Sequence, residues 1–128
     1  MRLLLDTQAF LFIVADDPRL TAAAKAAFLD PANEPLLSVA SAWEIAIKNS
    51  VGKLDLPSAA ARWIREQLAV NRIGLQPIEL EHATRVAELP FHHRDPFDRL
   101  LVAQALCENL AVVTGDDAFE QYGVERVW

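Results

Sequence analysis

The chain has 128 residues, of which 52% are hydrophobic and 23% are charged. This length and composition predict one folded domain and exclude a disordered chain. The formal net charge of −6 disfavours unaided binding to a phosphate backbone, so a nucleic-acid substrate would need a bound divalent cation or a basic partner.

The sequence offers no membrane segment and no internal disulfide bond. Its longest apolar run, residues 9–15, has seven residues, which is too short to cross a bilayer. Asp6, Thr7 and Gln8 interrupt the apolar N-terminus, so we do not expect a signal peptide. The single cysteine, Cys107, is typical of a reducing compartment. These features predict a cytoplasmic protein.

Short apolar runs alternate along the chain with stretches in which apolar residues recur at helical spacing. In chain order we predict a strand at 2–5, helices at 7–15 and 21–29, a strand at 36–39, helices at 41–50 and 58–70, a strand at 73–78, helices at 80–89 and 96–108, a strand at 110–114, a short helix at 117–122 and a strand at 124–127. Strands that alternate with helices indicate a single α/β domain, residues 1–128, with a central, mostly parallel sheet.

Four carboxylates are predicted to meet at the carboxyl edge of that sheet, where ligands bind in such folds. Asp6 closes the first strand, Glu44 lies near the start of the helix after the second strand, Asp98 opens the long helix, and Asp116 follows the strand at 110–114. Clustered carboxylates repel one another, and hard cations such as Mg²⁺ and Mn²⁺ take oxygen ligands. An acidic edge without a Cys/His ligand set therefore favours metal-assisted phosphodiester hydrolysis over zinc chemistry.

Each acid also has a purely structural explanation. Asp6 could cap the following helix, and Asp116 could be a turn residue. Ser41 and Glu44 fit the S-x-x-E capping box. Asp95 before Pro96 predicts an N-cap, and an acid at Asp98 suits the helix dipole.

Four segments resemble the motifs of the PIN-domain family, and among its members the VapC-like toxins of bacterial toxin–antitoxin pairs. They are LLLDTQAFLF, SVASAWEIAIKNSVGKLDLP, HHRDPFDRLLVAQAL and LAVVTGDDAFEQYGV, and together they cover nearly the whole chain in the family's order. The second and third segments are the more specific ones.

This resemblance implies a three-layer α/β/α domain and a metal-dependent endoribonuclease. It implies a four-acid Mg²⁺ or Mn²⁺ site, both catalytic and metal-binding, made of Asp6, Glu44, Asp98 and Asp116. It also implies cleavage of single-stranded RNA by activated water, a homodimer, and inhibition by a cognate antitoxin encoded alongside. A PIN-like protein that binds RNA or a partner without cutting stays open as the alternative.

Several neighbouring residues are candidates for supporting roles. The family pattern places its last acid at Asp116, although Asp117 could take that position. Asp95, Asp117, Thr7 and Thr114 could act in an outer shell around the metal, and local capping explains the two threonines equally well. Residues expected to contact RNA phosphates are Lys48, which also fits an ion pair with Glu44, and Arg94 and Arg99.

The remaining conspicuous residues are interpreted structurally. His92 and His93 are predicted to be loop residues rather than ligands. Cys107 is predicted to be a buried apolar group, and Trp43 and Trp63 to be core or interface residues.

Two other phosphate-handling folds carry acids at strand ends, and the sequence fits neither. A receiver-type signalling domain needs an acid pair at the first strand, a phosphoacceptor after a middle strand and a late lysine. Here Asp6 stands alone, the residue directly after 73–78 is Glu79 and not a phosphoacceptor aspartate, and no lysine occurs after Lys53. A haloacid-dehalogenase-like phosphatase needs D-x-D, and Gln8 occupies the second acidic position.

Overall fold

The computed structural model describes all of residues 1–128 and contains five strands and six α-helices. The strands are β1 (Arg2–Leu5), β2 (Glu34–Ser38), β3 (Gly74–Gln76), β4 (Ala111–Val113) and β5 (Arg126–Val127). The helices are α1 (Thr7–Ala15), α2 (Ala22–Leu29), α3 (Val39–Ser50), α4 (Ala60–Asn71), α5 (Leu80–Arg85) and α6 (Pro96–Glu108). Two 3₁₀ helices, η1 (Val86–Glu88) and η2 (Asp117–Tyr122), complete the chain.

The sheet is parallel throughout, with the strand order β3-β2-β1-β4-β5. The chain therefore moves outward from β1 through β2 to β3, and then crosses to the other side of β1 for β4 and β5. This reversal places a topological switch point between β1 and β4, and the carboxyl ends of strands at such a point border a crevice. The residues that follow β1 and β4 consequently lie next to each other.

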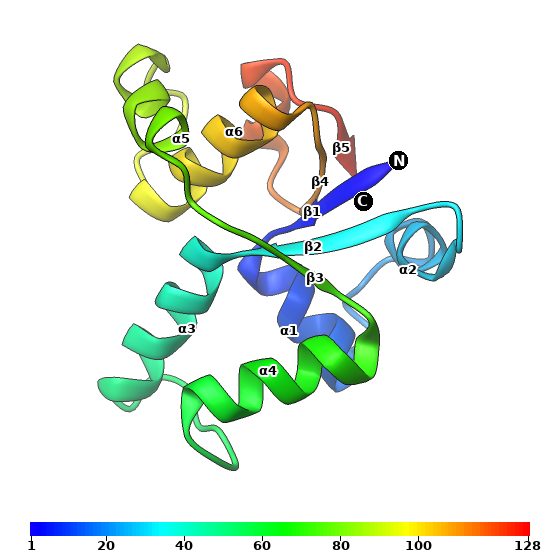
Figure 1. The fold of residues 1–128 in the computed structure, drawn as a ribbon. Coiled ribbons are helices and arrows are strands. Elements are labelled where there is room, and N and C mark those ends of the chain that lie inside the picture. Colours follow the sequence, from blue (N-terminus) through cyan, green and yellow to red (C-terminus); the bar gives the residue numbers. More distant parts are fainter.

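Helices cover both faces of the sheet, as the three-layer prediction requires (Figure 1). Alternation along β1 builds the two cores, because successive side chains of a strand point to opposite faces. Leu3 and Leu5 pack in the core beneath α1, α2 and α4, whereas Leu4 packs in the core beneath α6. All three leucines are fully buried, so β1 is the central strand that both layers share.

Helix caps explain where the site-bearing helices begin. Asp6 accepts a 2.7 Å hydrogen bond from the Ala9 N–H at the start of α1. Asp95 accepts from the Phe97 N–H at 2.8 Å, and Pro96 occupies the first position of α6, so the predicted bounds 96–108 are confirmed.

The structure corrects three local predictions. The N-cap of α3 is Ser38, which accepts from the Ala40 N–H at 3.0 Å, so α3 begins at Val39 and the capping box predicted at Ser41 is wrong. Cys107 is exposed rather than buried. The helix predicted to reach residue 89 ends at Arg85 and tightens into η1.

Three predicted strands are shorter than expected, and β4 contains only Ala111–Val113 of the predicted residues 110–114. β3 stops at Gln76 because Pro77 has no N–H to donate to the sheet. β5 contains only Arg126 and Val127 of the predicted residues 124–127. None of the helices is both long enough and apolar enough to cross a membrane.

Candidate functional site

The four predicted acids are brought to one edge of the sheet. Asp6 follows β1 directly, Asp116 lies in the turn after β4, and Glu44 and Asp98 project from the N-terminal halves of α3 and α6. Asp6 interacts electrostatically with Glu44 and Asp116, and Asp98 interacts with Asp6 and Glu44. Residues separated by up to 110 positions in the sequence thus form one acidic cluster.

Burial and mutual repulsion disfavour the charged state of two of these acids. Burial is the main cause that raises the pKa of Asp98 to about 7; the negative charges of Asp95, Asp6 and Glu44 also raise it, and His93 lowers it. Burial likewise raises the pKa of Asp6, despite hydrogen bonds from Thr114 and from the Ala9 N–H. A cation at this edge would favour the charged forms of both Asp98 and Asp6.

Glu44 is held from two helices. The Thr7 hydroxyl, at the start of α1, donates to Oε1 of Glu44 at 2.6 Å. Nζ of Lys48, one turn further along α3, lies 3.1 Å from Oε2 in the predicted i,i+4 ion pair. Both carboxylate oxygens are therefore oriented by protein groups, and the side chain of Glu44 is only 15% exposed.

Asp116 is held by the turn that follows β4. Its backbone N–H donates to Oγ1 of the buried Thr114 at 3.0 Å, and its Oδ1 accepts from the Ala118 N–H at 3.0 Å to cap η2. The side chain of Asp117 is exposed and makes no hydrogen bond to another group of the chain. Of the two adjacent acids, the geometry favours Asp116 as the fourth member of the cluster.

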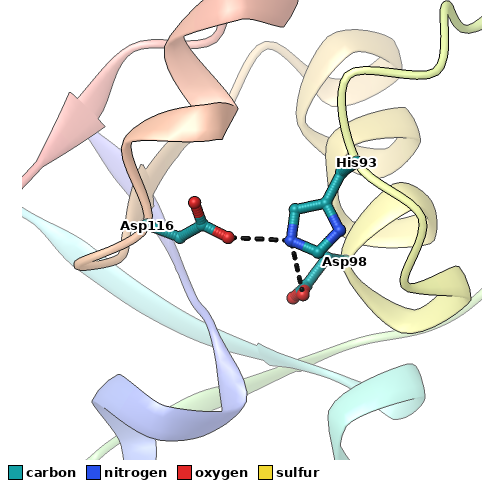
Figure 2. Close-up of side chains that lie close together, drawn as sticks. All are labelled: His93, Asp98 and Asp116. Carbon is teal, nitrogen blue, oxygen red and sulfur yellow. Dashed lines mark hydrogen bonds and ion pairs between the residues drawn. The ribbon is translucent and has the colours of Figure 1, made fainter.

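His93 lies between two of the acids, which the sequence analysis did not foresee (Figure 2). Its Nε2 is 2.8 Å from Oδ2 of Asp116 and 3.2 Å from Oδ2 of Asp98. A weak sequence signal existed: His93 is two residues before the N-cap Asp95, so it had to lie near the first turn of the helix that carries Asp98.

Arg99 is a structural residue, and the prediction that it contacts RNA is wrong. Its side chain is buried and donates to carbonyl oxygens of η1 and of the loop before α6, those of Val86, Leu89, Pro90 and His93, and to the Tyr122 hydroxyl. The ring of Phe91 covers the guanidinium at 4.3 Å. Arg94, by contrast, is exposed and remains available to a ligand.

The two tryptophans separate into a core residue and a surface residue. Trp63 is buried and packs edge-on against Phe10, with ring centroids 6.1 Å apart. Trp43 is 59% exposed and packs against Phe97 at 5.3 Å. Because Trp43 precedes Glu44 and Phe97 precedes Asp98, this aromatic pair borders the acidic cluster.

The site and the fold agree with a known family. The PIN domain family model matches residues 3–125, so the chain belongs to the PIN domain family. Ribonuclease VapC16 of Mycobacterium tuberculosis is 41% identical over 70 residues, a match that covers 52% of this chain and 48% of that protein. The match thus spans about half the length of the curated relative.

Solved structures of toxin–antitoxin proteins share the fold at low sequence identity. VapBC2 from Rickettsia felis, bound to a DNA fragment from its promoter, superposes with a TM-score of 0.74 at 17% identity, with 100% of both chains covered. VapBC-1 from nontypeable Haemophilus influenzae (TM-score 0.67, 17% identity) and DNA-bound VapBC from Salmonella typhimurium (0.66, 18%) each match over 98% of this chain and 96% of the other. These likenesses confirm the predicted PIN-like architecture.

Proposed function

We propose that this chain is a metal-dependent endoribonuclease and the toxin of a type II toxin–antitoxin pair. Asp6, Glu44, Asp98 and Asp116 would hold the cation, which we take to be Mg²⁺ or Mn²⁺. The observation that carries the proposal is the convergence of these four carboxylates at the β1/β4 switch point, where burial and mutual repulsion raise the pKa of Asp98 to about 7. The ribonuclease named among the relatives supports RNA as the substrate.

The donor set fits a hard divalent cation. Every member offers carboxylate oxygens, and no cysteine lies in the cluster. When bound, such a cation supplies the positive charge that stabilises the attacking and leaving oxygens of a phosphodiester hydrolysis. The protein's own contribution is orientation: Thr7 and Lys48 fix Glu44, and Thr114 fixes the turn that carries Asp116. We assign these groups, with Asp95, supporting roles around the cation.

Cleavage of a labelled single-stranded RNA by the purified protein tests this function. We expect cleavage with Mg²⁺ or Mn²⁺, no cleavage with excess EDTA, and loss of cleavage in Asp6→Asn. Asp117→Asn is the matched control, because its acid is adjacent to the cluster but exposed. Cleavage that persists in excess chelator would overturn the metal mechanism, and RNA binding without cleavage at any metal concentration would favour the non-cleaving alternative.

A basic partner fits the charge of the molecule. The chain carries a formal net charge of −6, and its acidic edge would attract an arginine or lysine from an inhibitor. The structural relatives are VapBC toxin–antitoxin complexes, which supports a cognate antitoxin as that partner. The product of a neighbouring gene should copurify with this chain and suppress cleavage. A partner that binds and leaves cleavage at full rate would contradict occlusion of the site.

The homodimer and the cytoplasmic location are parts of the same proposal. Trp43 and Ile47 of α3 and its C-cap residue Val51 are exposed and follow one another at four-residue spacing, which suits a contact between two copies. The exposed free thiol of Cys107 suits a reducing compartment. Light scattering on the purified chain should report twice the chain mass, and Trp43→Ala should lower it.

A further inference from the structure

We propose that His93 is a positioning residue that bridges Asp98 and Asp116, with its Nε2–H donating a hydrogen bond to Asp116 and lying in ion-pair contact with Asp98, and that it is not a metal ligand. The proposal rests on the proposed metal site, since it concerns how two of its acids are held. Nε2 of His93, Oδ2 of Asp98 and Oδ2 of Asp116 lie within 4.8 Å of one another, a spacing that would also suit three ligands of one ion. The other ring nitrogen distinguishes the two interpretations.

Nδ1 of His93 accepts a hydrogen bond from the Asp95 N–H at 3.0 Å. A nitrogen that accepts cannot carry a proton, so the single proton of the neutral ring is on Nε2. Nε2–H then points a donor at the two carboxylates, which can only accept. A histidine that binds metal through Nε2 needs the opposite tautomer, with Nδ1–H donating to a carbonyl or carboxylate. The backbone of Asp95 excludes that arrangement.

The main chain of His93 is anchored as firmly as its ring. Its N–H donates to the Tyr122 hydroxyl at 2.8 Å, and its carbonyl accepts from Arg99 at 3.4 Å. Arg99 also donates to Tyr122, at 3.3 Å, so one buried cation and one phenol fix both backbone groups. The imidazole, whose side chain is 20% exposed, is thus held over the acids by the loop that precedes α6 (Figure 2).

The bridge leaves the acids able to bind a cation. Each carboxylate oxygen has two lone pairs, and the hydrogen bond from His93 uses one of those on Oδ2 of Asp116. Oδ2 of Asp98 is an ion-pair contact of the same nitrogen at 3.2 Å. Oδ1 of Asp98 makes no hydrogen bond within the chain. A donor between two like charges offsets their repulsion and keeps Asp98 and Asp116 at a fixed spacing, which lowers the reorganisation that cation binding requires.

Two measurements test the bridge. In protein carrying ¹⁵N-labelled histidine, long-range ¹H–¹⁵N spectra should assign the His93 proton to Nε2, both without metal and with saturating Mg²⁺. Manganese titrations followed by electron paramagnetic resonance should show that His93→Ala weakens Mn²⁺ binding by roughly 10–100-fold, as loss of a hydrogen-bond partner of a metal ligand does. His93→Gln, which places an amide N–H near Nε2, should restore most of the affinity. His92→Ala is the matched control, because His92 is exposed and contacts only the Tyr122 ring of this network, and it should bind like the wild type.

The outcomes separate the bridge from its alternatives. A proton on Nδ1 in the Mg²⁺ form, or a directly bound ¹⁴N in the Mn²⁺ spectra, would make His93 a ligand and overturn the proposal. If His93→Ala binds Mn²⁺ with the affinity of the wild type, His93 does not position Asp98 and Asp116 for the cation. If the wild type binds no metal, the proposed function fails, whereas the tautomer in the metal-free protein still tests the bridge. If His93→Ala does not fold, the Mn²⁺ affinity of His93→Gln and the position of the proton in the wild-type spectra test the bridge instead.

Discussion

The hydroxyl of Thr7 donates a 2.6 Å hydrogen bond to Oε1 of Glu44, and this bond joins the helix after β1 to the helix after β2. Thr7 is buried, so its hydroxyl has little access to water as an alternative partner. The bond orients the carboxylate of Glu44 independently of any cation. It is the one side-chain hydrogen bond between α1 and α3.

Replacement of Thr7 tests that link. Thr7→Val keeps the shape of the side chain and removes the donor, so we expect a loss of about 1 kcal/mol in the free energy of unfolding, because one hydrogen bond is lost. Mn²⁺ binding should weaken in parallel. Thr7→Ser, which keeps the hydroxyl, should retain the affinity. Urea unfolding and Mn²⁺ titration of both variants check this, and a Thr7→Ser protein that binds Mn²⁺ as weakly as Thr7→Val would contradict it.

The pH dependence of stability should report Asp98. Its pKa in the folded protein, about 7, lies above its ordinary value of 3.8. The folded state therefore binds more protons than the unfolded state between about pH 4 and pH 7, and stability falls as the pH rises through this window. Metal-free wild type should melt at a lower temperature at pH 8 than at pH 5. Asp98→Asn should lose most of this slope, with a smaller part remaining from Asp6, whose pKa is also raised.

Metal linkage separates a ligand role of Asp98 from a helix-capping role. With Mn²⁺ at a hundred times its dissociation constant, the wild type should gain on the order of 2.7 kcal/mol. Metal-free Asp98→Asn should melt at or above the wild-type temperature at pH 8, because the substitution relieves repulsion, and it should lose most of the gain from Mn²⁺. A first-turn acid without a metal role would instead cost roughly 0.3–1 kcal/mol when replaced, with or without metal. Melting curves of both proteins in EDTA and in Mn²⁺ distinguish the two.

Much of this arrangement follows from local sequence patterns. The carboxyl ends of parallel strands lie at one edge of the sheet, so acids that follow two such strands, here Asp6 and Asp116, are expected at that edge for any loop conformation. The bounds of α6 follow from Asp95 and Pro96, which are both local signals. The predicted start of α3 was wrong because Ser38 and Ser41 both fit an N-cap, and the pairing of Ser38 with Gln76 of β3 is what ends the strand at Ser38.

The residues that escaped sequence reasoning depend on long-range contacts. His93 is fixed by Tyr122 and Asp116, which lie 29 and 23 residues further along the chain. The position of Arg99 beside an acidic motif suits a phosphate contact, but four main-chain carbonyls and the Tyr122 hydroxyl accept its N–H groups. The prediction that Cys107 is buried rested on residue type alone, and its position on α6 is exposed. No local pattern encodes these contacts.

Two nearby arginines should behave in opposite ways. Arg99→Met removes a buried cation that satisfies several carbonyls, so it should cost about 3 kcal/mol in unfolding free energy. Arg94→Ala alters an exposed side chain, so it should leave stability within about 0.5 kcal/mol and weaken RNA binding in a salt-dependent manner. Thermal melts and RNA titrations at two salt concentrations check both variants. If Arg94→Ala binds RNA with unchanged affinity, Arg94 does not contact the RNA.

Mn²⁺ binding to the purified protein and to its acid variants tests the central claim most directly. Isothermal titration at pH 8 should show binding by the wild type and by Asp117→Asn. It should show at least about tenfold weaker binding by Asp6→Asn, Glu44→Gln, Asp98→Asn and Asp116→Asn, because each removes one charged oxygen donor. Failure of the wild type to bind Mn²⁺, or loss of binding in Asp117→Asn while Asp116→Asn binds normally, would contradict the four-acid site.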